Sequence, residues 1–127
     1  MKNQKSTRGQ SIIEVIVALA LIAVVILGLV RVTISSINNA SFARDQRAAT
    51  KYAQEGIEKA RQLKEESGAV FWSKSGIETE TIGKFTRKTT YTEVEDNQKM
   101  LVEVEVSWQD SKGNHKSVLE TYLTKWK

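Results

Sequence analysis

The chain has 127 residues, and 19 Lys and Arg against 15 Asp and Glu give it a formal net charge of +4. Three of the basic residues, Lys2, Lys5 and Arg8, come before the first acid, and without them 16 basic residues oppose 15 acidic ones. Binding of phosphate needs clustered Lys and Arg, so this nearly neutral remainder predicts no clear nucleic-acid site. The absence of Cys excludes disulfide bonds, and the absence of Pro permits one long helix.

A long apolar run dominates the first quarter of the chain. Residues 12–30 are apolar or Gly at every position except Glu14. A helix rises 1.5 Å per residue, so about nineteen such residues match a hydrocarbon core of ~30 Å, and the run is predicted to span a membrane. An ionised carboxylate costs on the order of 2.5–3.5 kcal/mol at the centre of a span and less near its end, which predicts a partner for Glu14.

The basic residues before the run predict its orientation. No acid follows Lys2, Lys5 and Arg8 until Glu14, so the positive-inside rule keeps the N-terminus in the cytoplasm. Residues after about Arg31 are then translocated, and we expect a single-pass protein of the cell membrane whose C-terminal part is extracytoplasmic. About 90 residues remain for that part, which is enough for one small domain with a modest core.

The boundary between the basic segment and the apolar run resembles that of type IV prepilins and pseudopilins. The residues GQSIIEVIVALA, which begin at Gly9, match the pattern of that family without a gap. The resemblance implies that a prepilin peptidase cleaves after Gly9 and methylates the new N-terminus, Gln10, which leaves Glu14 at the fifth position of the mature chain. Gln10 departs from the Phe or Met that the family more often has there.

The same resemblance implies the partners of the chain. The lipid bilayer holds the N-terminal helix before assembly, and an inner-membrane assembly platform and other pilin or pseudopilin subunits receive it afterwards, in a pilus or pseudopilus. Glu14 is then expected to pair with the Gln10 amine of an adjacent subunit, because each charge is costly in an apolar environment without the other. A structural subunit is implied rather than an enzyme, with no cofactor and no metal.

Three other interpretations compete for the apolar run. A Sec signal peptide has a basic start and a shorter apolar core, and cleavage near Ala40 or Ala43 would fit it. A plain single-span anchor explains the length and the flanks but leaves Gly9 and Glu14 as coincidences. A buried helix of a soluble protein would not need the basic flank.

We expect the helix to continue beyond the span as an amphipathic segment over 32–67. Apolar residues recur there at spacings of three and four, and one stripe is formed by Tyr52, Ala53, Gly56, Ile57, Ala60 and Leu63. Polar side chains compete for backbone hydrogen bonds near Asn38 and Asn39, which predicts a bend or a looser turn. A left-handed Gly68 is expected to end the helix.

Residues 52–58, YAQEGIE, resemble the corresponding helix of minor pilins and minor pseudopilins. An alternative explanation of this segment is purely structural. Gly56 has no side chain, so it allows a strand or another helix to approach closely.

From Phe71 the apolar pattern changes to the period of two that is typical of strands. Four short strands are predicted, at 77–82, 84–95, 100–109 and 116–126, with turns at 96–98 and 110–114. The third strand alternates most clearly and places on one face Val102, Val104, Val106 and Trp108. The fourth strand is expected to close the sheet through Val118, Leu119, Tyr122 and Leu123. One face of this sheet is expected to cover the helix stripe.

Few residues suggest catalysis or ligand binding. His115 is the only His, and the chain has no Gly-rich phosphate loop and no ligand-spaced cluster. The acids Glu93, Glu95, Asp96 and Asp110 raise the question of calcium, but strand Glu residues spaced by two simply face solvent and the EF-hand pattern is missing. Core packing is expected for the aromatic residues Phe71, Trp72, Trp108 and Tyr122, whereas Trp126 is expected to be exposed.

The expected fold is therefore α+β and pilin-like, with a long N-terminal helix packed on a small antiparallel sheet of three to four strands. The expected organisation is a basic leader at 1–9, a transmembrane or filament-core half-helix at 10–31, an amphipathic half-helix at 32–67 and a sheet region at 68–127.

The resemblance implies a minor pilin or minor pseudopilin that serves secretion, adhesion, motility or DNA uptake. The alternative is a single-span membrane-anchored protein whose small extracytoplasmic domain binds a ligand. Removal or retention of residues 1–9 discriminates between the two.

Overall fold

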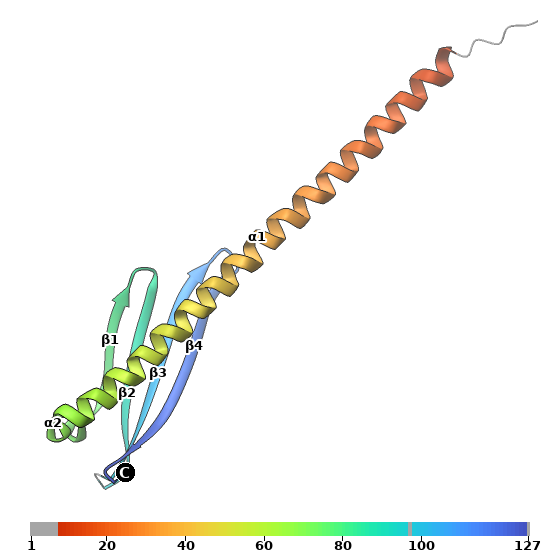
Figure 1. Ribbon diagram of the computed structural model, residues 1–127. Helices are drawn as coiled ribbons and strands as arrows, with labels where there is room; N and C mark the ends of the chain where they lie inside the picture. The colour runs from red at the N-terminus through yellow and green to blue at the C-terminus, as the bar shows by residue number, and fades with distance from the viewer. Residues whose placement is uncertain (1–7, 97, 127) are drawn as a thin grey trace, which may run out of the picture. The chain divides into compact units, whose positions relative to one another are not determined.

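The computed structural model describes residues 8–96 and 98–126, with side chains from Ser11 onward. The chain forms two units, one up to Ser41 and one from Phe42 to the C-terminus. Most of the predicted leader, and Asn97 of the predicted turn at 96–98, lie outside the described residues. Figure 1 shows the order of the elements, which is two helices followed by four strands.

Helix α1 spans Arg8–Glu66 and therefore runs through both units. It continues through Asn38 and Asn39, where a looser turn was expected. Helix elongation is cooperative, and good helix formers on both sides carry the helix across a short stretch of weaker residues. The Thr33 hydroxyl donates to the Leu29 carbonyl oxygen at 2.9 Å, which is a bond along the helix rather than a competing turn.

A second helix, α2, spans Gly68–Ser73 and was not predicted. The expected stop is present, because α1 ends at Glu66, but Gly68 does not have the left-handed φ that we expected there. Instead the chain turns at Ser67 and enters a helix whose Phe71 side chain is completely buried. Burial of this one large side chain decides the conformation of a short segment that has no clear periodicity of its own.

The four strands form one antiparallel sheet in the order β1-β2-β3-β4. Their bounds are Gly76–Ile82, Phe85–Glu95, Lys99–Asp110 and Gly113–Thr124. The four predicted strands are thus confirmed, with differences at their ends.

The turn between β3 and β4 is tighter than predicted. Asp110 already pairs with Gly113, so Ser111 and Lys112 alone make the connection. Gly113 has a φ of +125°, a conformation that residues with side chains rarely adopt, and this allows β4 to start earlier than expected. At its other end β4 stops at Thr124 rather than at Trp126.

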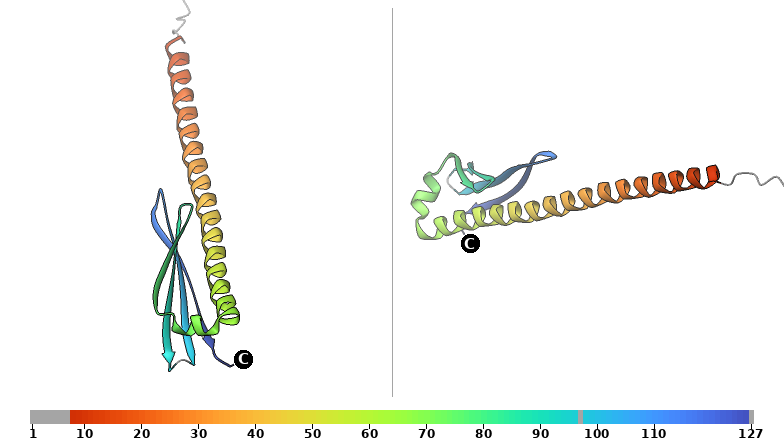
Figure 2. Two further views of the ribbon diagram at one scale, coloured as in Figure 1. Left: turned by 90° about the vertical axis from the view of Figure 1, so that its left-hand side faces the viewer. Right: turned by 90° about the horizontal axis from the view of Figure 1, so that it is seen from above.

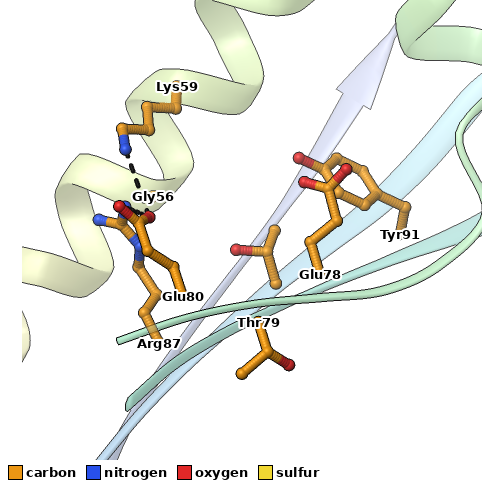
Figure 3. A pocket seen from close by; sticks show the side chains of 8 residues that line it. Gly56, Lys59, Glu78, Thr79, Glu80, Arg87 and Tyr91 are labelled. Atoms are coloured by element: carbon orange, nitrogen blue, oxygen red, sulfur yellow. Dashed lines mark hydrogen bonds and ion pairs between the residues drawn. The ribbon is translucent and has the colours of Figure 1, made fainter. Parts of the chain in front are cut away.

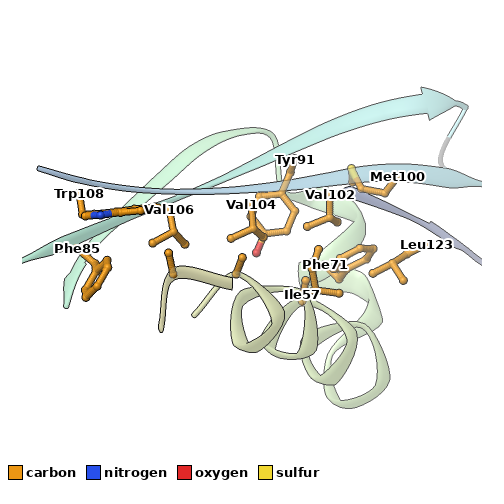
Figure 4. Close-up of a cluster of buried hydrophobic side chains, with 13 residues drawn as sticks. Ile57, Phe71, Phe85, Tyr91, Met100, Val102, Val104, Val106, Trp108 and Leu123 are labelled. Atoms are coloured by element: carbon orange, nitrogen blue, oxygen red, sulfur yellow. The ribbon is translucent and has the colours of Figure 1, made fainter. Parts of the chain in front are cut away.

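The C-terminal half of α1 packs on one face of the sheet within the second unit (Figure 2). The alternation predicted for β3 is confirmed, since Val102, Val104, Val106 and Trp108 are all buried. Figure 4 shows Val102, Val104 and Val106 on the side of the sheet that faces the helix. They meet a helix surface of small residues, because Ala49, Ala53 and Ala60 are fully buried and keep the helix close to the strands. The expected cover of the helix stripe by the sheet is therefore present.

Only half of the residues predicted to close the sheet through β4 do so. Leu123 is buried and Leu119 packs against the core, whereas Val118 and Tyr122 remain exposed. Successive strand residues point to opposite faces, so adjacent apolar residues such as Val118 and Leu119 cannot both face the helix. The open face of the sheet therefore presents Val118 and Tyr122 together with Lys116 and Glu120.

Candidate functional site

The apolar part of α1 is left uncovered by the rest of the described chain. An 18-residue window in this helix has a mean hydropathy of 3.1, and none of the window is buried inside the protein. Every described side chain from Ser11 to Ile37 is exposed. Soluble monomers rarely expose apolar surface on this scale, so lipid or other protein must cover it.

Glu14 is the only acid among the side chains described before Asp45. It lies in α1 with apolar neighbours before and after it, and the next charged side chain is Arg31. Gln10 precedes Glu14 by four residues, which is about one turn of helix. The roles expected of Gly9, Gln10 and Glu14 depend on a peptidase and on neighbouring subunits, and the isolated chain contains neither.

Comparison with known proteins identifies the N-terminal segment. Residues 4–30 match the family model for the prokaryotic N-terminal methylation motif. No curated protein and no solved structure matches the chain. The chain therefore carries the type IV prepilin signature, on a long helix packed against a four-stranded antiparallel sheet.

This signature supports a pilin-like structural subunit. It implies processing by a prepilin peptidase and assembly with other pilin subunits. Together with the apolar helix, it supports anchoring in a membrane and assembly into a pilus.

A buried charge lies between the second half of α1 and the sheet. Arg87 of β2 is 3% exposed, and its guanidinium donates to the Tyr52 carbonyl oxygen at 3.1 Å. It also donates to the Glu80 carboxylate (Figure 3). Hydrogen bonding by Arg87 lowers the pKa of Glu80, and Lys59 adds to this from 3.4 Å. These ion pairs join α1, β1 and β2, so Arg87 helps to hold the helix against the two strands.

Gly56 explains how the Arg87 side chain reaches the helix backbone. A Cβ atom at Gly56 would lie 2.8 Å from Val104 Cγ1 and 3.2 Å from Arg87 Cδ. The structural explanation offered for residues 52–58 is therefore confirmed, since Gly56 does permit a close approach of the sheet. Sequence reasoning missed Arg87, although the alternation of β2 places it on the same face as Phe85, Thr89 and Tyr91.

The other residues considered as sites are dispersed. Among residues 8–96 and 98–126, no group of three or more His, Cys, Asp or Glu side chains is placed to hold a metal ion. Asp110 instead contacts His115 at 2.9 Å, and this contact lowers the pKa of Asp110. The acids Glu93, Glu95 and Asp96 lie at the end of β2 and in the following turn, away from Asp110 along the strand direction.

Most of the aromatic side chains contribute to the core, as expected. Phe71 and Trp108 are buried, Trp72 packs against the core, and Trp126 is exposed. Tyr122 differs from the expectation because it lies on the open face, where Lys99 Nζ lies 4.6 Å from the centre of its ring.

The contacts of the Phe42 ring were not predicted. Phe42 of α1 lies 6.3 Å from Trp108 and 4.9 Å from His115, measured between ring centroids. Phe42 stands about one turn before the buried Asp45 and about two turns before the buried Ala49, so the spacing of the helix stripe does carry a signal for it.

Proposed function

We propose that this chain is a minor pilin or minor pseudopilin, cleaved after Gly9 and methylated at Gln10 by a prepilin peptidase. The observation that carries the proposal is the methylation motif at residues 4–30, followed by an apolar helix surface that the chain itself leaves uncovered. The assignment to the minor branch rests on the resemblance of residues 52–58 alone, and the packing role of Gly56 accounts for one residue of that segment without it. The assembled structure is a pilus or pseudopilus serving secretion, adhesion, motility or DNA uptake.

The apolar helix serves two environments in this proposal. Residues 10–31 span the membrane before assembly, with the leader in the cytoplasm and the sheet region outside, as the basic residues before the span favour. An inner-membrane assembly platform then transfers the helix to a bundle of similar helices. The transfer needs no refolding, because lipid and the packed side chains of neighbouring helices are both apolar surroundings for the same surface.

Glu14 directs the transfer to the correct neighbour. A carboxylate inside the bundle is costly alone, and so is the amine that cleavage creates at Gln10. Placing Glu14 of one subunit beside the Gln10 amine of another neutralises both charges. This pairing also specifies the register of the two helices, because no other acid lies in the apolar run.

The experiment that tests the proposal is intact-mass measurement of protein extracted from membranes. The expected mass lacks Met1–Gly9 and carries one methyl group on Gln10. Gly9→Leu should abolish cleavage, because a large side chain next to the scissile bond obstructs the peptidase.

Gly28→Leu is the matched control for a change from Gly to Leu on the same helix. It lies beyond the cut, and a Cβ there has nothing within 4 Å, so cleavage should persist. Retention of Met1 in the parent chain, with the matching peptidase present, contradicts the proposal and favours a membrane-anchored ligand-binding protein.

A further inference from the structure

A polar cavity of about 210 Å³ lies between the second half of α1 and the strands β1 and β2, entirely within the second unit. This volume is several times the ~30 Å³ share of one water molecule and is below the ~300–1,000 Å³ of pockets that hold drug-sized ligands. The space therefore suits one ring-sized molecule. Its polar side chains include Lys59 of α1, Glu78 and Glu80 of β1, and Arg87, Thr89 and Tyr91 of β2.

The floor of the cavity is formed by alternate residues of one strand. Arg87, Thr89 and Tyr91 of β2 are 3%, 8% and 7% exposed. Strand β2 is held between β1 and β3 in the sheet. Side chains on a strand with two hydrogen-bonded neighbours are held in place more firmly than side chains on a loop, so this floor is present before any ligand arrives.

The charges that face the cavity already have partners. Arg87 and Lys59 both donate to the same Glu80 oxygen, Oε2, and Figure 3 shows these three side chains together. Glu78 forms an ion pair with Lys74. A charged ligand would have to displace one of these partners and leave a charge beside the buried Arg87 uncompensated. The cavity therefore favours a ligand without net charge.

Hydrogen-bonding capacity nevertheless remains at the cavity. The Thr89 hydroxyl forms no hydrogen bond with any residue that the structure describes. It is not fully enclosed either, since Trp108 Nε1 is the one completely buried side-chain polar atom without a partner in the described chain. The Thr89 hydroxyl therefore borders the cavity. Both contacts of Glu80 use Oε2, which leaves its Oε1 as a further acceptor.

We propose that this cavity binds one neutral pyranose sugar residue. Each sugar hydroxyl both donates and accepts a hydrogen bond, and the cavity intersperses acceptors with donors. Glu80 Oε1 accepts from one hydroxyl, the Thr89 hydroxyl bonds to the next, and Lys59 retains N–H groups that donate to the ring substituents at the rim. An amide fits this lining less well, because it keeps its donors and its acceptor on separate atoms.

Saturation-transfer NMR on the full-length chain tests the class of ligand. The protein is held in micelles of deuterated dodecylphosphocholine, which has no sugar in its headgroup, and micelles without protein give the background. The neutral probes are glucose, galactose and N-acetylglucosamine, and acetate and glycine represent an anion and a zwitterion of smaller size. We expect transfer from the protein to ring protons of at least one sugar and none to acetate or glycine.

A pair of Thr to Val changes on neighbouring residues of β2 locates the site. Thr89→Val removes the hydroxyl at the floor and keeps the shape of the side chain, so it should raise the Kd for the sugar by about three- to ten-fold, the equivalent of one neutral hydrogen bond. Thr90→Val is the matched control, because Thr90 points to the opposite face of the sheet. Its Kd should equal that of the parent. Thermal melts followed by circular dichroism verify that both variants are folded.

Three results overturn the proposal. Absence of transfer to all three sugars shows that the cavity holds water only. Transfer to acetate or glycine in place of the sugars shows that the ligand is charged. An unchanged Kd in folded Thr89→Val, or an equal loss in Thr90→Val, places sugar binding outside the cavity. The inference does not rest on the proposed function, because intact mass measured on the same sample reports leader removal separately, and retention of the leader leaves the cavity of the second unit unchanged.

Discussion

Lys84 and Asp45 join the β1–β2 turn to α1 across the edge of the core. The Lys84 Nζ atom lies 2.6 Å from Asp45 Oδ2, and Asp45 is only 4% exposed although it is charged. Lys84 follows Gly83, whose φ of +60° allows the tight turn between the two strands. One ion pair therefore connects the start of the packed helix segment to a turn 39 residues later.

The first prediction concerns this ion pair. Lys84→Met should lower the free energy of unfolding by about 1 kcal/mol, since Lys84 remains half exposed and water screens the pair. Asp45→Asn with Lys84→Met should cost less than the sum of the single changes, because the double variant leaves no buried charge without its partner. Denaturant unfolding of the four proteins measures the coupling, and strictly additive effects would show that the ion pair contributes nothing.

The second prediction is that residues 35–127 fold without the apolar run, because the buried core belongs entirely to the second unit. The fragment should be a soluble protein with one cooperative thermal transition. Ile57→Asp or Val104→Asp should abolish or strongly lower that transition, since each places an unpaired carboxylate in the core.

Val118→Asp is the matched control for this test. Val118 is 43% exposed on the open face of the sheet, so the same change there should shift the transition little. If the three variants melt alike, the assignment of the two sheet faces is wrong.

The third prediction concerns the contact between Gly56 and Val104. Gly56→Ala adds a methyl group that would lie 2.8 Å from Val104 Cγ1, and overpacking of this kind costs about 1–3 kcal/mol. The gain in helix propensity, about 1 kcal/mol, offsets part of that cost. We therefore expect Gly56→Ala to lower the free energy of unfolding of the fragment. In the Val104→Ala background the obstructing methyl groups are gone, so Gly56→Ala should restore part of the stability that Val104→Ala removes. A more stable Gly56→Ala protein would contradict the close approach.

The fourth prediction is a pH dependence from Asp110 and His115. Hydrogen bonding by His115, followed by the Lys112 backbone N–H, holds the pKa of Asp110 below its ordinary value of 3.8. A group with a lowered folded-state pKa stabilises the fold above its unfolded pKa and loses that contribution as pH falls through the folded pKa. His115→Phe should therefore flatten the loss of stability below about pH 4. Equal acid slopes for His115→Phe and the parent would exclude this role for the pair.

The spacing of apolar residues along the sequence predicted those elements in which buried positions recur at a regular interval. The alternation of Val102, Val104 and Val106 identified β3 and its buried face, because one side of a strand sees only the core. The apolar run identified the uncovered half of α1, because it is apolar on every side of the helix and no face of it is reserved for a core. The segment around Gly9 and Glu14 predicted the processing motif.

Other features depend on contacts that a local pattern does not contain. Helix α2 forms around Phe71, whose burial depends on Tyr91 and other residues of the sheet. The burial of Arg87 was not predicted, because it depends on Gly56, Glu80 and the Tyr52 carbonyl oxygen, which lie on other elements. The exposure of Tyr122 follows from the register of β4, which the sequence of one strand does not determine.

The last prediction concerns Glu14 and separates insertion and cleavage from assembly. Glu14→Leu removes the only charge from the apolar run, so insertion should become easier by a fraction of the 2.5–3.5 kcal/mol cost at the membrane centre. Cleavage after Gly9 should persist, because the residues at the cut are unchanged. Assembly should fail, because the Gln10 amine of a neighbour would enter an apolar bundle without its counter-charge, at a cost on the order of 3–5 kcal/mol.

Val15→Leu is the matched control for Glu14→Leu, since it changes an adjacent side chain of α1 without changing the charge of the helix, and it should behave like the parent. The measurement compares abundance in the membrane fraction, leader removal and recovery in sheared filaments or partner complexes. Normal recovery of Glu14→Leu would show that its carboxylate does not direct assembly, whereas loss of membrane abundance would place its role in insertion instead.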